Sequence, residues 1–66
     1  MHIHLNGESY QVAKPVAVRD LLSLLKKDIS KVAVEVNFKV VPLKEHQSTM
    51  LQEGDVVEIV TLVGGG

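Results

Sequence analysis

The sequence predicts an α+β fold, in which a mixed β-sheet carries one main helix across one of its faces. Three observations lead to this prediction: alternating residues at both ends of the chain, one helical stripe of apolar residues between them, and a length that permits one domain. The chain has 66 residues, of which 45% are hydrophobic. A chain of this size buries about 60% of the surface that it exposes when unfolded, so we expect one thin core between helix and sheet.

The first predicted element is a β-hairpin. Residues 2–5 alternate between polar and apolar, which is the period of a half-buried strand. Asn6-Gly7 follows, and both residues tolerate the positive φ angles of the type I′ turn that joins hairpin strands. We expect the second strand to run from Glu8 to about Ala13, because Pro15 lacks the N–H group that a strand needs.

The apolar spacing then changes to that of an amphipathic helix of about ten residues. Its stripe, at i, i+3, i+4 and i+7, consists of Val18, Leu21, Leu22 and Leu25. Asp20 in the first turn and Lys26-Lys27 in the last turn suit the helix dipole. Ala17 stands near the expected N-cap and is a poor cap, because it has no side-chain oxygen for the free N–H groups.

The second half of the chain returns to strands. The predicted elements are a strand at 32–36, a turn at Asn37-Phe38, a short strand at 39–41 ended by Pro42, one helical turn near 43–46, a loop at 52–55 and a last strand at 56–63. Because the helix connects the second strand to the third, the last strand can insert beside the first, parallel to it and in the centre of the sheet.

This order of elements predicts a β-grasp, or ubiquitin-like, domain over residues 1–63 and a flexible glycine tail at 64–66. The inward-facing positions of the helix and strands give the expected core: Ile3, Leu5, Val12, Val18, Leu21, Leu22, Leu25, Val34, Val36, Val57 and Ile59.

The charge and cysteine content exclude several classes of protein. Seven basic and eight acidic residues give a net charge of −1, which provides no basic surface for nucleic acid. The absence of cysteine excludes disulfides, thiolate nucleophiles and thiolate metal sites, and makes the cytoplasm the default compartment. No apolar run approaches the roughly 20 residues of a membrane helix, and no secretory signal follows Met1. We expect a cytoplasmic protein, monomeric on its own, that binds neither nucleic acid nor membranes.

No motif of catalytic or metal-ligating residues is recognisable. A zinc site built from His2, His4 and the distant His46 is conceivable, but no carboxylate or cysteine stands at a ligand-like spacing. We favour solvated histidines on an open sheet face and expect no bound metal. Glu53 and Asp55 are a possible carboxylate pair, but they belong to a turn sequence that favours a structural role. We therefore expect a protein that is not an enzyme and binds no cofactor of its own.

One face of the last strand is more apolar than a solvated surface requires. Val57 and Ile59 are assigned to the core, whereas Val60 and Leu62 lie on the opposite face, immediately before the tail. An exposed apolar patch on a small domain indicates a partner surface, and we assign Val60, Leu62 and Val63 to it. The alternative is that Leu62 and Val63 fold back over the edge of the core, and the sequence alone favours neither.

Three glycines, Gly64, Gly65 and Gly66, end the sequence. They have no side chains to pack, and glycine loses more backbone entropy than any other residue when it is ordered. Fully extended, residues 63–66 reach about 13 Å beyond the sheet, and a segment without side chains can thread a narrow channel to a buried reaction centre. The alternatives are a frayed end or a remnant of cloning. A tail continuous with a strand, in a chain that starts with Met1, argues for a natural terminus.

Four segments carry a resemblance to a known family. They are Ile3-His4-Leu5-Asn6-Gly7-Glu8, Val18-Arg19-Asp20-Leu21-Leu22, Val36-Asn37-Phe38-Lys39-Val40-Val41-Pro42, and Leu51-Gln52-Glu53-Gly54-Asp55-Val56-Val57-Glu58-Ile59-Val60 leading into Val63-Gly64-Gly65-Gly66. In this order, and with the terminal glycines, the chain resembles the ThiS family of thiamine-biosynthesis sulfur carriers over essentially its whole length. Ala17 departs from the family, which usually has a better cap such as threonine, and the third glycine is a compatible variant ending.

The resemblance implies a protein co-substrate on which partner enzymes act. A ThiF-like, E1-type adenylyltransferase would use ATP and magnesium to convert the Gly66 carboxylate to an acyl-adenylate, with Gly64 and Gly65 threaded into its site. A persulfide from a cysteine desulfurase or an equivalent donor would displace AMP and leave a Gly66 thiocarboxylate. A ThiG-like thiazole synthase would then take the sulfur into the thiazole of thiamine.

Three alternative functions share some of these features. The small subunit of molybdopterin synthase has the same fold, tail and thiocarboxylate chemistry, although the segment from Asn37 to Pro42 and the short length favour the thiamine carrier. A ubiquitin-like protein modifier would join its terminal glycine to lysines of other proteins. A plain structural domain with an unused tail is the third.

Overall fold

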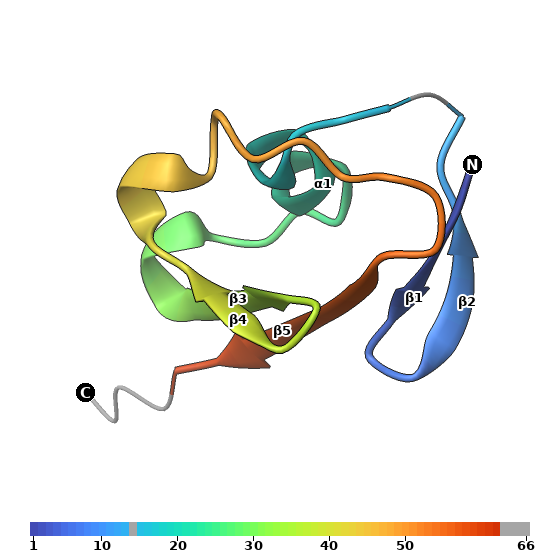
Figure 1. Cartoon of the computed structure of the whole chain (residues 1–66). Coiled ribbons are helices and arrows are strands. Elements are labelled where there is room, and N and C mark those ends of the chain that lie inside the picture. Colours follow the sequence, from blue (N-terminus) through green and yellow to red (C-terminus); the bar gives the residue numbers. More distant parts are fainter. Residues whose placement is uncertain (14, 63–66) are drawn as a thin grey trace.

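A computed structural model describes residues 1–13 and 15–62 of the chain. In chain order, its elements are β1 (His2–Leu5), β2 (Glu8–Gln11), α1 (Val18–Leu24), the 3-10 helix η1 (Ile29–Lys31), β3 (Val32–Val36), β4 (Lys39–Val41), the 3-10 helix η2 (Leu43–Glu45) and β5 (Val56–Thr61). Figure 1 shows α1 lying across one face of the sheet. The predicted α+β class, with one main helix on a sheet, is therefore confirmed. None of the helices in this part of the chain has the length and apolar character needed to cross a membrane.

The five strands form one mixed sheet in the order β2-β1-β5-β3-β4. β1 and β5 run parallel, with Leu5 opposite Val57. β5 also pairs antiparallel with β3 along its other edge, so the last strand of the sequence occupies the centre of the sheet. This arrangement confirms the β-grasp prediction and the parallel insertion of the last strand beside the first.

Two strands are shorter than the sequence predicts. β2 ends at Gln11 rather than at Ala13, because Gln11 already pairs with the first residue of β1. β5 ends at Thr61, whose partner Val32 is the first residue of β3, and the chain before Val32 belongs to η1. Val63, the predicted end of this strand, lies outside the described residues.

Both hairpins turn on two residues with positive φ. Asn6 and Gly7 have φ angles of 49° and 84°, and Asn37 and Phe38 have φ angles of 52° and 70°. Two consecutive residues in this region are characteristic of the type I′ turn, so both predicted turns are confirmed. Phe38 is the unusual member, since a bulky side chain is strained at positive φ.

Replacing Phe38 with glycine is expected to stabilise the protein. The Phe38 side chain is 78% exposed, so its removal sacrifices little burial, whereas glycine adopts a φ of 70° without steric cost. Relief of the strain should exceed the entropy cost of glycine and raise the free energy of unfolding by about 0.5–1 kcal/mol. Urea denaturation measures this change. Asn37→Gly is the matched control, and it should not stabilise, because asparagine tolerates this region and its side chain makes hydrogen bonds. A loss of stability in Phe38→Gly would contradict the strain argument.

The N-terminus of α1 is capped by carbonyl groups from a distant loop. Ala17 makes no side-chain cap, as its residue type predicts. Instead, the N–H of Val18 donates to the carbonyl of Thr49, and the N–H of Arg19 donates to the carbonyl of His46, both at 2.9 Å. The loop between η2 and β5 therefore compensates for the weak cap by satisfying helix donors that would otherwise be free.

The C-terminus of α1 comes earlier than predicted, and the helix has seven residues. Leu25 is the C-cap and Lys26 has a φ of 58°. The N–H groups of Lys26 and Lys27 donate to the carbonyls of Ser23 and Leu22, which is the bonding pattern of a Schellman motif. Both lysines therefore follow the helix, and the prediction that they occupy its last turn is wrong.

The core lies between α1 and the sheet and is larger than predicted. Leu5, Leu25 and Val36 are only partly buried and pack against it, while the other predicted core residues are buried. The sequence prediction omitted several buried hydrophobic residues, namely Val16, Ala17, Val32, Val41 and Leu51. Leu51 is the largest of these, and it is 1% exposed although it stands in a loop without a regular pattern.

Candidate partner-binding surface

β5 is the last strand before the C-terminus, where the sequence predicts the functional residues. Val60 is the fifth residue of this strand, and Leu62 follows its end. The predicted threading residues Gly64 and Gly65, the predicted reaction site Gly66 and the predicted surface residue Val63 lie outside the described residues. The structure thus places the strand that leads to the tail, and the roles of these four residues stay predictions.

The side chain of Asn6 holds β5 from the β1 side. Its Oδ1 accepts a hydrogen bond from the N–H of Ile59 at 2.8 Å, and its Nδ2 donates to the carbonyl of Ile59 at 3.3 Å. The N–H of Asn6 also donates to the carbonyl of Val57 at 2.9 Å. Asn6 therefore continues the pairing of β1 with β5 beyond the last residue of β1, and fixes β5 two residues before its end.

Asn37 and Asp55 hold the start of β5 in a similar way. The Oδ1 of Asn37 accepts from the N–H of Val56 at 3.0 Å, and its Nδ2 donates to the Oδ1 of Asp55 at 3.1 Å. The Oδ2 of Asp55 accepts from the N–H of Gln52 at 2.8 Å. The sequence identified Asn6 and Asn37 as turn residues, but their bonds to β5 depend on long-range pairing that no local pattern reveals.

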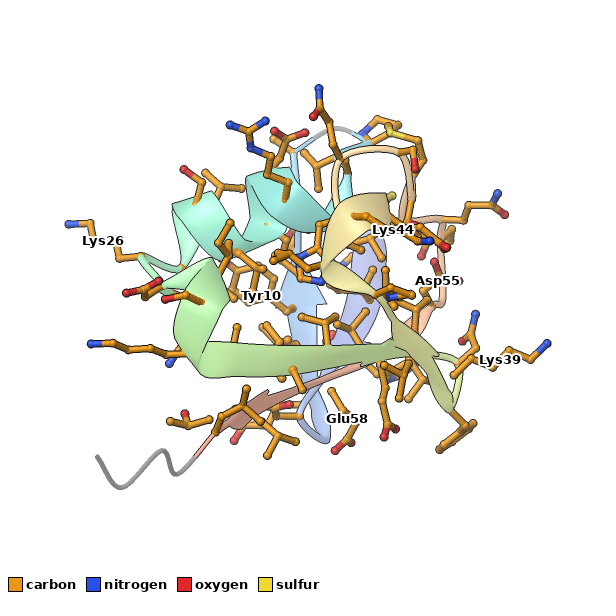
Figure 2. All side chains as sticks on the ribbon, turned by 90° about the vertical axis from the view of Figure 1, so that its left-hand side faces the viewer. Tyr10, Lys26, Lys39, Lys44, Asp55 and Glu58 are labelled. Atoms are coloured by element: carbon orange, nitrogen blue, oxygen red, sulfur yellow. The ribbon has the colours of Figure 1, made fainter. Side chains whose placement is uncertain are left out.

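The structure leaves one face of the sheet facing away from α1; we call it the outer face. Its residues are His2, His4, Ser9, Gln11, Ala33, Glu35, Val40, Val56, Glu58 and Val60. Figure 2 shows Glu58 pointing away from the helix layer. Val40 is 65% exposed, Val60 is 53% exposed, and Leu62, next along the chain, is 52% exposed. Half of Leu62 is exposed, so this residue is not part of the buried core.

The three histidines do not come together. His2 and His4 are exposed on the outer face, whereas His46 is buried, with 4% of its surface exposed. The Nε2 atom of His46 lies 3.1 Å from the carbonyl oxygen of Val41, so it carries the proton and donates, and Nδ1 is buried and has no hydrogen-bond partner among the residues that the structure describes. From the sequence, His46 is recognisable only as a possible metal ligand, and no local pattern predicts that it is buried.

Within residues 1–13 and 15–62, no group of three or more potential ligands among His, Cys, Asp and Glu is placed to hold a metal ion. Glu53 and Asp55 do not form a catalytic pair, since Glu53 accepts from the N–H of His2 at 3.0 Å and Asp55 is bound as described above. Their predicted structural role is thereby supported. A shallow depression beside α1 is lined by Pro15, Val16, Asp20, Ser23 and Leu24, and it lies on the helix side of the molecule rather than on the outer face.

These features define a class of protein: a β-grasp domain whose central strand leads toward a C-terminal segment of glycines, beside a partly apolar outer face. The sequence model of the ThiS family matches residues 3–66, and the chain belongs to this family. The resemblance noted from the sequence is therefore confirmed.

Solved structures agree with the family assignment. The crystal structure of the thiamine biosynthesis protein ThiS from Geobacter metallireducens superposes with a TM-score of 0.88, at 35% identity and over 100% of both chains. The solution structure of a thiamine biosynthesis protein from the same organism gives a TM-score of 0.84, at 35% identity and over 100% of this chain and 88% of the other. The fold is thus that of ThiS.

Two kinds of curated relative are similar in sequence. The uncharacterized protein ycf40 of Porphyra purpurea is 36% identical over 64 residues, which cover 97% of this chain and 90% of ycf40. A thiazole synthase of Magnetococcus marinus is 41% identical and one of Paramagnetospirillum magneticum is 38% identical, each over all 66 residues. The chain spans 20% of the length of each thiazole synthase, so these proteins contain a similar segment within a longer chain.

Proposed function

We propose that this protein is a sulfur carrier in thiamine biosynthesis, and that partner enzymes act on the carboxylate of Gly66. The observation that carries the proposal is the match to the sequence model of the ThiS family, which covers residues 3–66. The central position of β5 supports it, because a tail that follows a strand held on both edges starts from a fixed point. In this role the protein is a co-substrate and not an enzyme.

The first step activates the carboxylate, which is a poor electrophile as long as it is ionised. A ThiF-like, E1-type adenylyltransferase transfers AMP from ATP to Gly66, releasing pyrophosphate and forming an acyl-adenylate. ATP and magnesium bind in that partner, and Gly64 and Gly65 pass through its channel without side chains to obstruct them. The chain has no cysteine, so no thiol of its own can attack the activated Gly66.

The next steps load and deliver the sulfur. The terminal sulfur of a persulfide, supplied by a cysteine desulfurase or an equivalent donor, attacks the acyl carbon and displaces AMP. A second thiol then cleaves the sulfur–sulfur bond by exchange, which leaves a thiocarboxylate on Gly66. A ThiG-like thiazole synthase takes this sulfur into the thiazole ring. The sequence similarity to segments of two thiazole synthases favours this acceptor over molybdopterin synthase.

Intact-mass analysis of the C-terminus tests the proposal. The protein is incubated with the adenylyltransferase of the same organism, ATP and a sulfur donor. The expected product is heavier by the difference between sulfur and oxygen, and it should not form when ATP or the donor is omitted. An isopeptide adduct on lysines of other proteins would instead indicate a protein modifier, and an unchanged mass under all conditions would refute the proposal.

Charged substitutions in the exposed apolar patch are expected to weaken partner binding. Val60→Lys and Leu62→Lys place a charge where about half of each side chain is already exposed, so each should lower the melting temperature by less than about 4 °C. Affinity for thiazole synthase should fall about ten-fold. Leu24→Lys is the matched control, because Leu24 is 59% exposed on α1, on the helix side of the molecule. If Val60→Lys and Leu62→Lys lose stability rather than affinity, these side chains belong to the core.

A further inference from the structure

Two glutamates face each other in the middle of the outer face. The antiparallel register of β3 and β5 places Glu35 directly opposite Glu58. Side chains paired in this way start about 4.5–5.5 Å apart at their Cβ atoms, and like charges in such a pair are destabilising. Both residues are also partly buried, which reduces the screening of their charges by water. The free protein thus places two glutamates directly opposite each other within an otherwise apolar region, an arrangement in which ionised side chains repel.

Their outward neighbours on β3, β4 and β5 provide no compensating cation. The other outward residues of β3, β4 and β5 are Ala33, Val40, Val56 and Val60, and none of them is basic. Val40 lies directly opposite Glu35 on its other side, and Ala33 lies opposite Val60 in the next row. His4, the nearest outward residue of β1 in the register, pairs with Val56 rather than with Glu58.

Exposed apolar side chains adjoin this acidic pair. Val40 lies beside Glu35 on β4, and Val60 lies two residues beyond Glu58 along β5; both are more than half exposed, and Leu62 extends the same surface past the end of β5. An acidic pair beside apolar side chains is complementary to a cationic side chain set among apolar side chains, and such complementarity selects the partner and its orientation. Arginine fits best, because its planar guanidinium can bind carboxylates on two sides.

We propose that the outer face docks thiazole synthase through a basic side chain of that enzyme, which lies between Glu35 and Glu58 while apolar side chains cover Val40, Val60 and Leu62. This inference rests on the proposed function, and thiazole synthase is chosen because two such enzymes contain a segment similar to this whole chain. Docking then sets a positive charge beside the two like charges of Glu35 and Glu58. The surface includes β5, the strand that leads to Gly66, so the same contact brings the C-terminal end of this strand to the enzyme.

The proposal predicts opposite effects on stability and on binding. The double variant Glu35→Gln, Glu58→Gln removes the repulsion, so the melting temperature should rise by about 2–4 °C. The affinity for thiazole synthase, measured by calorimetry with the enzyme of the same organism, should fall at least about ten-fold, and its dependence on NaCl concentration should decrease. Glu58→Lys, which can form an ion pair with Glu35, should also stabilise the protein and weaken binding further.

Glu45→Gln is the matched control, because Glu45 lies in η2, outside the outer face, and the variant loses the same charge. Glu45→Gln should change neither the melting temperature nor the affinity for thiazole synthase. Binding of the double variant with wild-type affinity would overturn the inference, as would a loss of affinity accompanied by a loss of stability. The thiocarboxylate assay is run on the same samples. If the wild-type protein forms no thiocarboxylate, the proposed function is refuted. If the thiocarboxylate forms and the double variant binds thiazole synthase with unchanged affinity, only the docking inference is refuted.

Discussion

Deletion of Gly66 is expected to abolish adenylation while leaving the fold intact. The deletion moves the terminal carboxylate back by about 3.5 Å, the length of one extended residue. A reaction at a fixed centre is sensitive to displacements of this size, since misplacement by about 1 Å can cost about a hundred-fold in rate. Gly66 has no side chain to contribute to the core, so the melting temperature should change by less than about 1 °C.

Release of pyrophosphate from ATP, with the adenylyltransferase in excess, measures this effect. One additional glycine after Gly66 displaces the carboxylate in the opposite direction and should abolish the reaction as well. Phe38→Gly, which alters an exposed turn away from the C-terminus, should be adenylated at the wild-type rate. Retained adenylation of the shortened chain would contradict the assignment of Gly66 as the reacting residue.

Truncation of Leu51 to alanine is expected to have the largest effect on stability. The Leu51 side chain is 1% exposed and belongs to the core, and its N–H donates to the carbonyl of Val16 at 2.9 Å. Removing a buried leucine side chain costs about 2–5 kcal/mol, since the transfer free energy is lost and a cavity is left. A domain of this size has a total stability of roughly 3–10 kcal/mol, so the variant should lose a large share of it.

Met50→Ala is the matched control for Leu51→Ala. Met50 is the adjacent residue, and 52% of its side chain is exposed, so its truncation should cost less than about 1 kcal/mol. Urea denaturation of the two variants under the same conditions gives both values. Equal losses in the two variants would contradict the view that the loop before β5 is anchored in the core by Leu51.

Local patterns in the sequence were sufficient for most of the architecture. The two turns follow from residues that accept positive φ or stand between short alternating segments, and the order of elements gives the parallel pairing of β1 with β5. The end of α1 could not be predicted in the same way, because Lys26 occupies a left-handed position at which glycine is the usual signal. The path of the chain from η2 to β5 has no regular period, so neither Leu51 nor His46 is recognisable as a core residue.

In the candidate site, too, some features are visible in the sequence and others depend on the fold. The glycines and the apolar character of Val60 and Leu62 are visible in the sequence, because they are properties of single residues or of one strand. The bonds from Asn6 to β5 and the apposition of Glu35 and Glu58 require the register between strands distant in sequence. Register is set by the whole sheet, so these features appear only once the fold is known.

Because β5 lies in the centre of the sheet and comes last in the sequence, the sheet can be completed only late in synthesis. β2 and β1 form one hairpin, β3 and β4 form another, and β5 is the strand that joins them into a single sheet. Without β5, these strands can form only two separate hairpins with unpaired inner edges, and an isolated hairpin is at best marginally stable in water. The sheet therefore closes only after translation has supplied the last strand, and a product terminated before β5 has no stable sheet to present to an enzyme.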